Sequence, residues 1–293
     1  MSTPGAALDA LRQRRPEWSP WLAVVEEVLR ETTNPTWDAS VPDRSDPHDG
    51  RTPLLAGASV GVDATLVRRM LERLVTVASR SGTPKMASLK RSLHANTDIL
   101  SLFRAALLQE SGDVAGIAAA SDTDPEALQA VVALLPLPFL HACNRRWASA
   151  VSPGWAEGHC PVCASWPAFA EVRGIERSRF FRCGRCGGEW YASILRCGYC
   201  GTLDHDDLVA LVPGKTGSPA AIDACRHCQG YIKTFTRLQG CAPAAVMLED
   251  LASVDLDVAA LEQGFARPSG AGYIMDVAVS DTGIARRFFA WNA

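Results

Sequence analysis

The sequence predicts an α+β protein: an α-helical N-terminal domain, then two tandem four-cysteine metal modules, then a C-terminal helical tail. The first 150 residues are rich in Ala and Leu at helical spacing and hold one cysteine, Cys143. Eight of the ten cysteines then form four Cys-x-x-Cys pairs between positions 160 and 228. From Ala244 the apolar residues return to helical spacing, with a stop near Gly264. We expect domains at 1–150, 156–196, 197–240 and 241–293, with residues 150–158 as a linker.

Start and stop signals place helices in the first domain. Ser19 followed by Pro20 has the pattern of an N-cap with proline at the first helical position. Asp63 and Asp124 are also expected to cap helices, the second of them running through Leu135. A further helix, containing Leu102, Ala105, Ala106 and Leu108, should end near Gly112. The proline-rich and glycine-rich stretch 32–61 is expected to be an irregular surface loop.

After the linker the chain changes to cysteine, glycine, arginine and short runs with β propensity. Each of these runs lies next to a Cys-x-x-Cys pair, which predicts a repeat of pair, strand, pair, strand in 160–195 and again in 197–235. The expected strands are Arg179–Arg182, Glu189–Leu195, Leu208–Val212 and Tyr231–Phe235.

The cysteine spacing favours two four-cysteine metal sites. Two cysteines at i and i+3 chelate one ion through a tight turn, and a tetrahedral site needs two such turns. The 19 residues between Cys163 and Cys183 fall in the range typical of such sites, and the 24 between Cys200 and Cys225 are slightly more. Glycine often follows the second cysteine of such a pair. Gly187 and Gly201 occupy this position in two of the pairs, whereas Ala164 and Gln229 occupy it in the other two. The predicted ligands are Cys160, Cys163, Cys183 and Cys186 in one site and Cys197, Cys200, Cys225 and Cys228 in the other.

Three alternatives stay open at this point. A site made of the two central pairs would close a hairpin over ten residues and use up the expected strand 189–195. Redox-active pairs of thioredoxin type would need a helix beneath the first cysteine, and iron–sulfur cluster motifs have other spacings. The metal itself also stays open, because an all-sulfur tetrahedral site accepts zinc or iron.

Composition and the absence of known motifs argue against several functions. The net charge of −3 gives no electrostatic footprint for nucleic acid, and residues 1–18 have no apolar stretch typical of a secretory signal. The most apolar run, Val131–Leu140, contains two prolines and is too short to span a membrane. No Gly-rich phosphate loop, HExxH or nucleophile elbow is present, so we expect a soluble, cytoplasmic protein that is not an enzyme.

Other polar residues near the modules are weaker candidates. His159, His205 and His227 are expected to lie at the surface or beside the sites without binding metal. The acidic run Asp204–Asp207 would suit a basic partner, although a solvated loop is the simpler interpretation. We expect Cys143 and Cys241 to be small buried apolar side chains, and Trp190 and Tyr191 to pack on the modules.

The motif order resembles that of the FdhE family, the accessory factors of formate dehydrogenase. The likeness rests on HCPVCASWP (159–167), RFFRCGRCGGEWYASILRCGYCG (179–201), ACRHCQGYIKTF (224–235) and EDLASVDLDVAALEQGFARPS (249–269). It implies two rubredoxin-like or zinc-ribbon-like modules and all eight cysteines as ligands of two metal ions, with iron favoured. It further implies a cytoplasmic factor that binds the catalytic subunit of formate dehydrogenase during maturation. Redox sensing at iron–thiolate centres is an additional option.

Two functional hypotheses follow. The first is a non-enzymatic assembly factor whose metal modules form one rigid surface, held together by the short connection 189–195. The second is a nucleic-acid-binding zinc-ribbon protein, because six arginines lie around the first module: Arg173, Arg177, Arg179, Arg182, Arg185 and Arg196. A thiol oxidoreductase is a third possibility, and the oligomeric state stays open.

Overall fold

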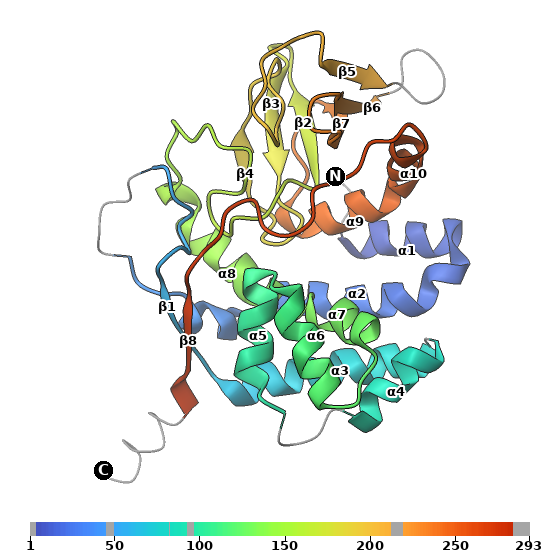
Figure 1. Cartoon of the computed structure of the whole chain (residues 1–293), viewed down its shortest axis with the longest axis vertical. Coiled ribbons are helices and arrows are strands. Elements are labelled where there is room, and N and C mark those ends of the chain that lie inside the picture. Colours follow the sequence, from blue (N-terminus) through green and yellow to red (C-terminus); the bar gives the residue numbers. More distant parts are fainter. Residues whose placement is uncertain (1–3, 45–49, 82, 93–96, 212–218, 284–293) are drawn as a thin grey trace. The chain divides into compact units, whose positions relative to one another are not determined.

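The computed structural model describes residues 4–44, 50–81, 83–92, 97–211 and 219–283 (Figure 1). The chain divides into two compact units that are interleaved along the sequence. One unit contains residues 1–7, 47–55 and 147–274, and the other contains 8–46, 56–146 and 275–293. The α+β class predicted from the sequence is confirmed, whereas the four predicted domain ranges stay a prediction.

The second unit is mainly helical, with a core of large apolar side chains that include Trp37, Phe103 and Phe139. Its helices, the first of which begins in the other unit, are α1 (Pro4–Arg14), α2 (Ser19–Thr32), α3 (Ala64–Ser81), α4 (Pro84–Ser92), α5 (Ile99–Leu108), α6 (Ser111–Ala120), α7 (Pro125–Val132) and α8 (Leu137–Trp147). The segment Pro125–Ala150 is long and apolar enough to cross a membrane, but 72% of its most apolar window is buried inside the protein, as in a core helix.

The helix signals in the sequence succeed where a carboxylate caps the first turn. Asp124 accepts a hydrogen bond from the amide of Ala127 at 3.0 Å, and Asp63 accepts one from the amide of Thr65 at 2.8 Å. The expected Ser19 cap is wrong, because Ser19 already lies inside α2 and Trp18 is the cap without a side-chain bond. Gly112 does not end a helix either: α5 ends at Leu108, Gln109 adopts φ 61°, and Gly112 lies within α6.

The stretch 32–61 is more ordered than the sequence predicts. Pro35–Ser40 forms a 3₁₀ helix that carries the fully buried Trp37, and Ser59–Val62 forms strand β1. Strand β1 pairs in parallel with β8 (Ala278–Asp281), a partner more than 200 residues away. Residues 45–49 of this stretch lie outside the described part of the chain.

The cysteine-rich unit is built on one six-stranded sheet with the order β4-β3-β2-β7-β6-β5. The strands are β2 (Phe169–Arg173), β3 (Ser178–Arg182), β4 (Glu189–Tyr191), β5 (Leu208–Leu211), β6 (Ala220–Cys225) and β7 (Tyr231–Arg237). Each half is a three-stranded antiparallel meander, and the halves join through the parallel pair β2–β7. The repeat unit is therefore pair, two strands, pair, strand, one strand more than the sequence suggested.

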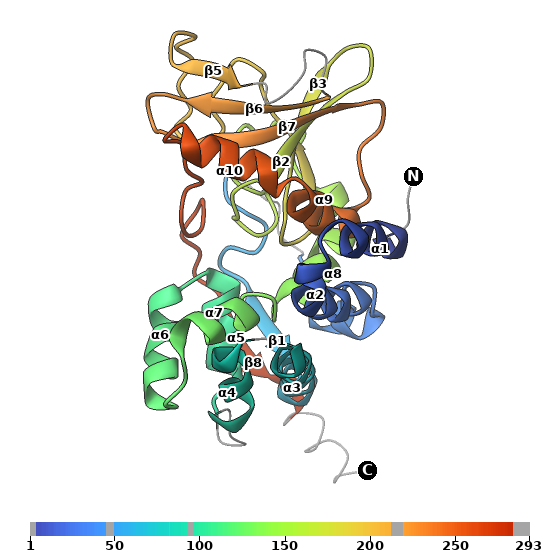
Figure 2. The same ribbon diagram turned by 90° about the vertical axis from the view of Figure 1, so that its right-hand side faces the viewer.

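Two helices cover one face of this sheet, α9 (Val246–Ala252) and α10 (Val254–Glu262), as Figure 2 shows. Val246 at the start of α9 packs on Phe169 of β2, and Ala260 of α10 packs on Ile222 of β6 and Tyr231 of β7. The helical tail that the sequence predicts after Ala244 is thus present and forms one layer of the metal-module unit.

Candidate metal centres

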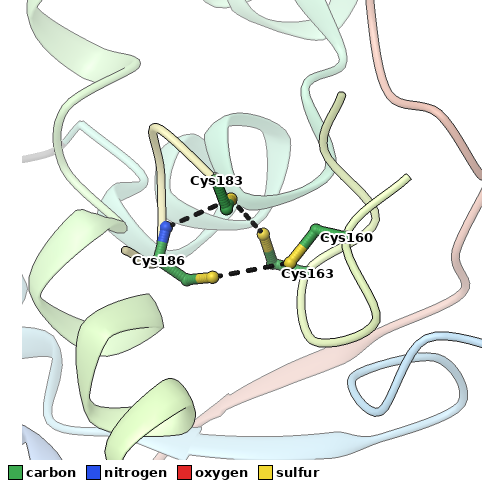
Figure 3. A group of neighbouring side chains, drawn as sticks. All are labelled: Cys160, Cys163, Cys183 and Cys186. Atoms are coloured by element: carbon green, nitrogen blue, oxygen red, sulfur yellow. Dashed lines mark hydrogen bonds between the residues drawn. The ribbon is translucent and has the colours of Figure 1, made fainter. Parts of the chain in front are cut away.

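The eight cysteines of the four pairs come together in two clusters with the sequential grouping that their spacing predicts. One cluster is Cys160, Cys163, Cys183 and Cys186, and the other is Cys197, Cys200, Cys225 and Cys228. In each cluster the first cysteine of one turn faces the second cysteine of the other turn, as Figure 3 shows for the first cluster. The alternative site built from the two central pairs is not formed.

The sulfur spacing fits a single tetrahedral metal ion. Metal–thiolate bonds of about 2.3 Å require sulfurs about 3.8 Å apart at the corners of a tetrahedron. The facing sulfurs are 3.5 and 3.4 Å apart in the first cluster and 3.7 and 3.8 Å apart in the second. All ligand atoms of a cluster lie within 4.8 Å of one another, and a disulfide would need a separation near 2.0 Å. Both clusters could therefore hold a metal ion, and the donor set suits zinc and iron equally.

The four Cys-x-x-Cys turns share one backbone conformation. The residue after the second cysteine has a positive φ in every turn: 62° at Ala164, 73° at Gly187, 56° at Gln229 and 75° at Gly201. The turn thus imposes a left-handed residue even where the sequence supplies Ala or Gln, which are strained there. The missing glycines at 164 and 229 are a local cost and do not signal a different fold.

Backbone amides in the turns point at the sulfurs. The amides of Val162 and Tyr199 lie 3.4 Å from the sulfurs of Cys160 and Cys197, respectively. The amide of Gly188 lies 3.4 Å from that of Cys186. These donors stabilise thiolates, because an N–H bond to sulfur favours the charged form.

Within each cluster, the pKa of one thiol is lowered and that of another is raised. Hydrogen bonds from the neighbouring thiols hold the pKa of Cys163 well below its ordinary value, whereas burial raises that of Cys160. In the second cluster burial acts to raise the pKa of Cys200 but is outweighed by the amide of Thr202 and the neighbouring thiols, while burial raises that of Cys228. A bound divalent ion would offset the negative charge of all four thiolates in a cluster, and pairs of Cys-x-x-Cys turns are suited to bind such an ion.

The two clusters differ in exposure. All four cysteines of the first are 0% exposed, whereas Cys200 and Cys228 of the second are exposed. The first cluster is covered by segments distant in sequence: the amides of Leu54 and Leu55 donate to the carbonyls of Pro161 and Val162 at 2.7 and 3.1 Å. The amide of Gly272 donates to the carbonyl of Ala164 at 2.8 Å. Sequence reasoning missed these two covering segments, because no periodicity marks them.

The other polar candidates take no part in the clusters. His205 and His227 are exposed, and His159 is buried beside Trp155, Trp166 and Tyr273. Trp190 is buried against Phe181, whereas Tyr191 is 57% exposed. Cys143 is fully buried, and Cys241 is only partly buried.

Three of the six arginines around the first module are held in internal ion pairs. Arg173 and Arg182 both contact Glu171 and Glu189, and Arg179 contacts Asp223 at 2.8 Å. Arg182 and Arg179 are almost fully buried. Half of the basic cluster in the sequence is therefore part of the sheet.

The motif at 249–269 has a structural explanation. Lys233 of β7 is 0% exposed, and its Nζ lies 2.7 Å from Asp250 and 2.9 Å from Asp257. Arg267 pairs with the same two carboxylates at 2.7 and 2.8 Å. This network fixes α9 and α10 to the sheet, since every charge in it has a partner.

The fold and the clusters together define a class of protein: a helical unit joined to tandem zinc-ribbon-like modules that share one sheet. Among curated proteins, the chain is 34% identical over 116 residues to the Protein FdhE homolog of Aquifex aeolicus. The matched region is 39% of this chain and 40% of the relative. It is 34% identical over 118 residues to the Protein FdhE homolog of Pseudomonas aeruginosa. The chain thus spans about two fifths of the length of these relatives. No known family profile matches the chain.

Among solved structures, the crystal structure of the FdhE protein from Pseudomonas aeruginosa has the same fold. The likeness covers 93% of this chain and 94% of that one, with a TM-score of 0.57 and 22% identity. The sequence likeness covers about two fifths of the chain, and the structural likeness shows that the two proteins share a fold.

Proposed function

We propose that the chain is an accessory protein in the maturation of formate dehydrogenase and binds the catalytic subunit of that enzyme. The observation that carries this proposal is the double likeness to FdhE proteins, in sequence over 116 residues and in fold over 93% of the chain. The protein acts as a binding and assembly factor and not as a catalyst. Its place of action is the cytoplasm, where the client is assembled.

The eight cysteines would hold two metal ions, one in each cluster. Each ion would stabilise the fold of its module, because a module with a small core depends on its metal for folding. Iron is the favoured metal on the family resemblance, and it would also let the centres respond to redox state. The chain's own contribution is a rigid pair of sites, because both clusters are carried by one continuous sheet.

Nucleic-acid binding is the less favoured function. The arginines that would have to contact phosphates are in part buried and paired with carboxylates. The second module also carries Asp204, Asp206 and Asp207 on its surface, which would repel a phosphate backbone.

The test is affinity capture from the native host. The tagged protein should co-purify with the catalytic subunit of formate dehydrogenase, and freshly prepared protein should contain two metal ions per chain. A red colour that reductant bleaches would identify iron, and a colourless protein with two zinc ions would identify zinc. Capture without any formate dehydrogenase subunit, or salt-sensitive binding to DNA or RNA in its place, would contradict the proposal.

A further inference from the structure

The second centre lies beside an apolar groove on the face of the sheet opposite α10. The groove has a volume of about 210 Å³, and its walls include Cys197 and Cys225 of the centre itself. Ile222 packs beneath α10, whereas the neighbouring Asp223 and Cys225 line the groove. Because successive strand residues point to opposite faces, the groove is on the side of the sheet away from α10.

Large apolar side chains stand exposed at the mouth of this groove. Ile194 and Leu195, in the turn after β4, are 55% and 68% exposed and line it. A second hollow of about 380 Å³ adjoins it, shares Arg196, Cys197, Gly198 and Tyr199, and includes the 57% exposed Tyr191. Several large apolar residues around two adjoining hollows are typical of a surface that a partner covers.

An acidic loop lies next to the groove, because it runs directly into Leu208, which lines the groove. Asp204, Asp206 and Asp207 precede β5, and the carbonyl of Asp207 accepts a hydrogen bond from the amide of Arg226 at 2.8 Å, which holds this loop beside the second centre. Four thiolates around one divalent ion add further negative charge.

The basic groups nearby are already engaged. Arg179 pairs with Asp223, and Arg196 donates to the carbonyl of Ala156 at 2.9 Å. Arg226 donates to the carbonyl of Asp206, and His205 and His227 lie 3.6 and 3.9 Å from Asp206 and Asp207. A partner that adds positive charge beside an apolar side chain would complement this surface.

We propose that this groove is the docking site for a partner polypeptide segment that carries an apolar side chain next to Lys or Arg. The apolar side chain fills the groove beside Cys197 and Cys225, and the basic side chain faces Asp204–Asp207. The identity of the partner as the catalytic subunit of formate dehydrogenase rests on the proposed function, whereas the chemistry of the segment rests on the groove alone.

The first experiment measures the affinity of the full-length protein for the purified catalytic subunit. The double variant Ile194→Asp/Leu195→Asp should bind about tenfold more weakly or worse, because it places charge in the apolar anchor site. The matched control is Ile175→Asp/Leu238→Asp, since these side chains are 98% and 84% exposed but do not line the groove, and it should bind as the wild type does.

The variant Asp204→Asn/Asp206→Asn/Asp207→Asn should weaken binding and flatten its salt dependence. Metal content and thermal unfolding show that each variant is folded.

A second experiment needs no client. Isotopically labelled protein is titrated with two synthetic peptides that differ only in carrying Leu with Lys or Leu with Glu. The Lys peptide should shift the resonances of Ile194, Leu195 and Leu208–Ala210, and the Glu peptide should not. Groove shifts without binding of the catalytic subunit would leave the groove standing and refute the proposed function. Equal binding of the subunit to all variants, with no groove shifts, would refute the groove and leave the function standing.

Discussion

Gly158 packs directly on the peptide group of Gly198, so closely that a Cβ on Gly158 would overlap the carbonyl oxygen of Gly198. Gly158 comes two residues before the first cysteine of the first centre, and Gly198 lies inside the first turn of the second centre. A Cβ on Gly198 would in turn meet Phe181 at 2.5 Å and Ile232 at 2.6 Å. The two modules are therefore joined by backbone contact as well as by the shared sheet.

Replacing Gly158 by Ala should destabilise the protein by roughly 1–3 kcal/mol, because a methyl group must be forced between two backbones. Thermal unfolding at fixed metal load measures the effect. Gly116→Ala is the control, because Gly116 lies within α6 and no atom comes within 4 Å of the position that the added methyl group would take. This control should stabilise the protein by up to about 1 kcal/mol. Equal unfolding temperatures for Gly158→Ala and the wild type would show that the modules are not packed in this way.

The left-handed residues of the turns give a second prediction. Gln229→Gly should stabilise the protein by about 1 kcal/mol, because Gln229 is exposed at φ 56° and glycine removes the strain. Ala164→Gly should change stability little, since Ala164 is fully buried and the relief of strain is offset by the lost methyl contacts. Gly201→Ala should destabilise the protein by about 1 kcal/mol, because it places a side chain at a left-handed residue. Denaturant unfolding of the metal-loaded variants tests the three signs, and a destabilised Gln229→Gly would contradict the shared turn geometry.

The sequence was informative where the signal is local. Four cysteine turns, the caps at Asp63 and Asp124, and the helices after Ala244 each follow from a few neighbouring residues. One strand of each module was missed, β2 in the first and β6 in the second. Strand β2 is buried at four of its five positions, so it shows no alternation of apolar and polar residues. Strand β6 has the sequence AAIDAC, and Ala and Asp have low β propensity. The expected strand 189–195 is wrong beyond Tyr191, because Ile194 and Leu195 form an exposed apolar turn.

What the sequence could not predict depends on long-range pairing. The parallel pairs β2–β7 and β1–β8, and the bonds from Leu54 and Leu55 to the first cysteine turn, join residues far apart in the chain. The connection that makes the two modules rigid is therefore the continuous sheet and the Gly158–Gly198 contact, more than the short link that the sequence suggested.

The charge network beneath α9 and α10 should make stability depend on pH. Burial acts to raise the pKa of Asp250, but Arg267 and Lys233 outweigh it, so the pKa lies below its ordinary value of 3.8. A carboxylate with a lowered pKa stabilises the fold above its unfolded pKa, and that stabilisation is lost as the pH falls through the folded pKa. Unfolding free energy should therefore fall below about pH 4.

The variant Asp250→Asn isolates this contribution. It should lose roughly 2–4 kcal/mol at neutral pH, because Lys233 and Arg267 keep their charges with one carboxylate fewer. Its stability should then fall less steeply below pH 4 than that of the wild type. Since thiolates also take up protons in acid, metal content must be followed in the same titration. Parallel pH profiles for the two proteins would contradict the assignment.

The unequal cover of the two centres predicts unequal loss of metal. The second centre contains the exposed residues Cys200 and Cys228, whereas the first lies beneath residues 54–55 and Gly272. Treatment with a chelator should therefore release the metal in two phases of equal amplitude, the fast phase from the second centre. Cys200→Ser should abolish the fast phase and leave the slow one.

Hydrogen exchange assigns the slow phase to the first centre. In the wild type, the amides of Leu54, Leu55 and Gly272 should stay protected through the fast phase and lose protection only with the slow one. The reason is that their acceptors belong to the turn of Cys160 and Cys163. Loss of protection at these amides during the fast phase would mean that the first centre opens first, against the burial of its four sulfurs.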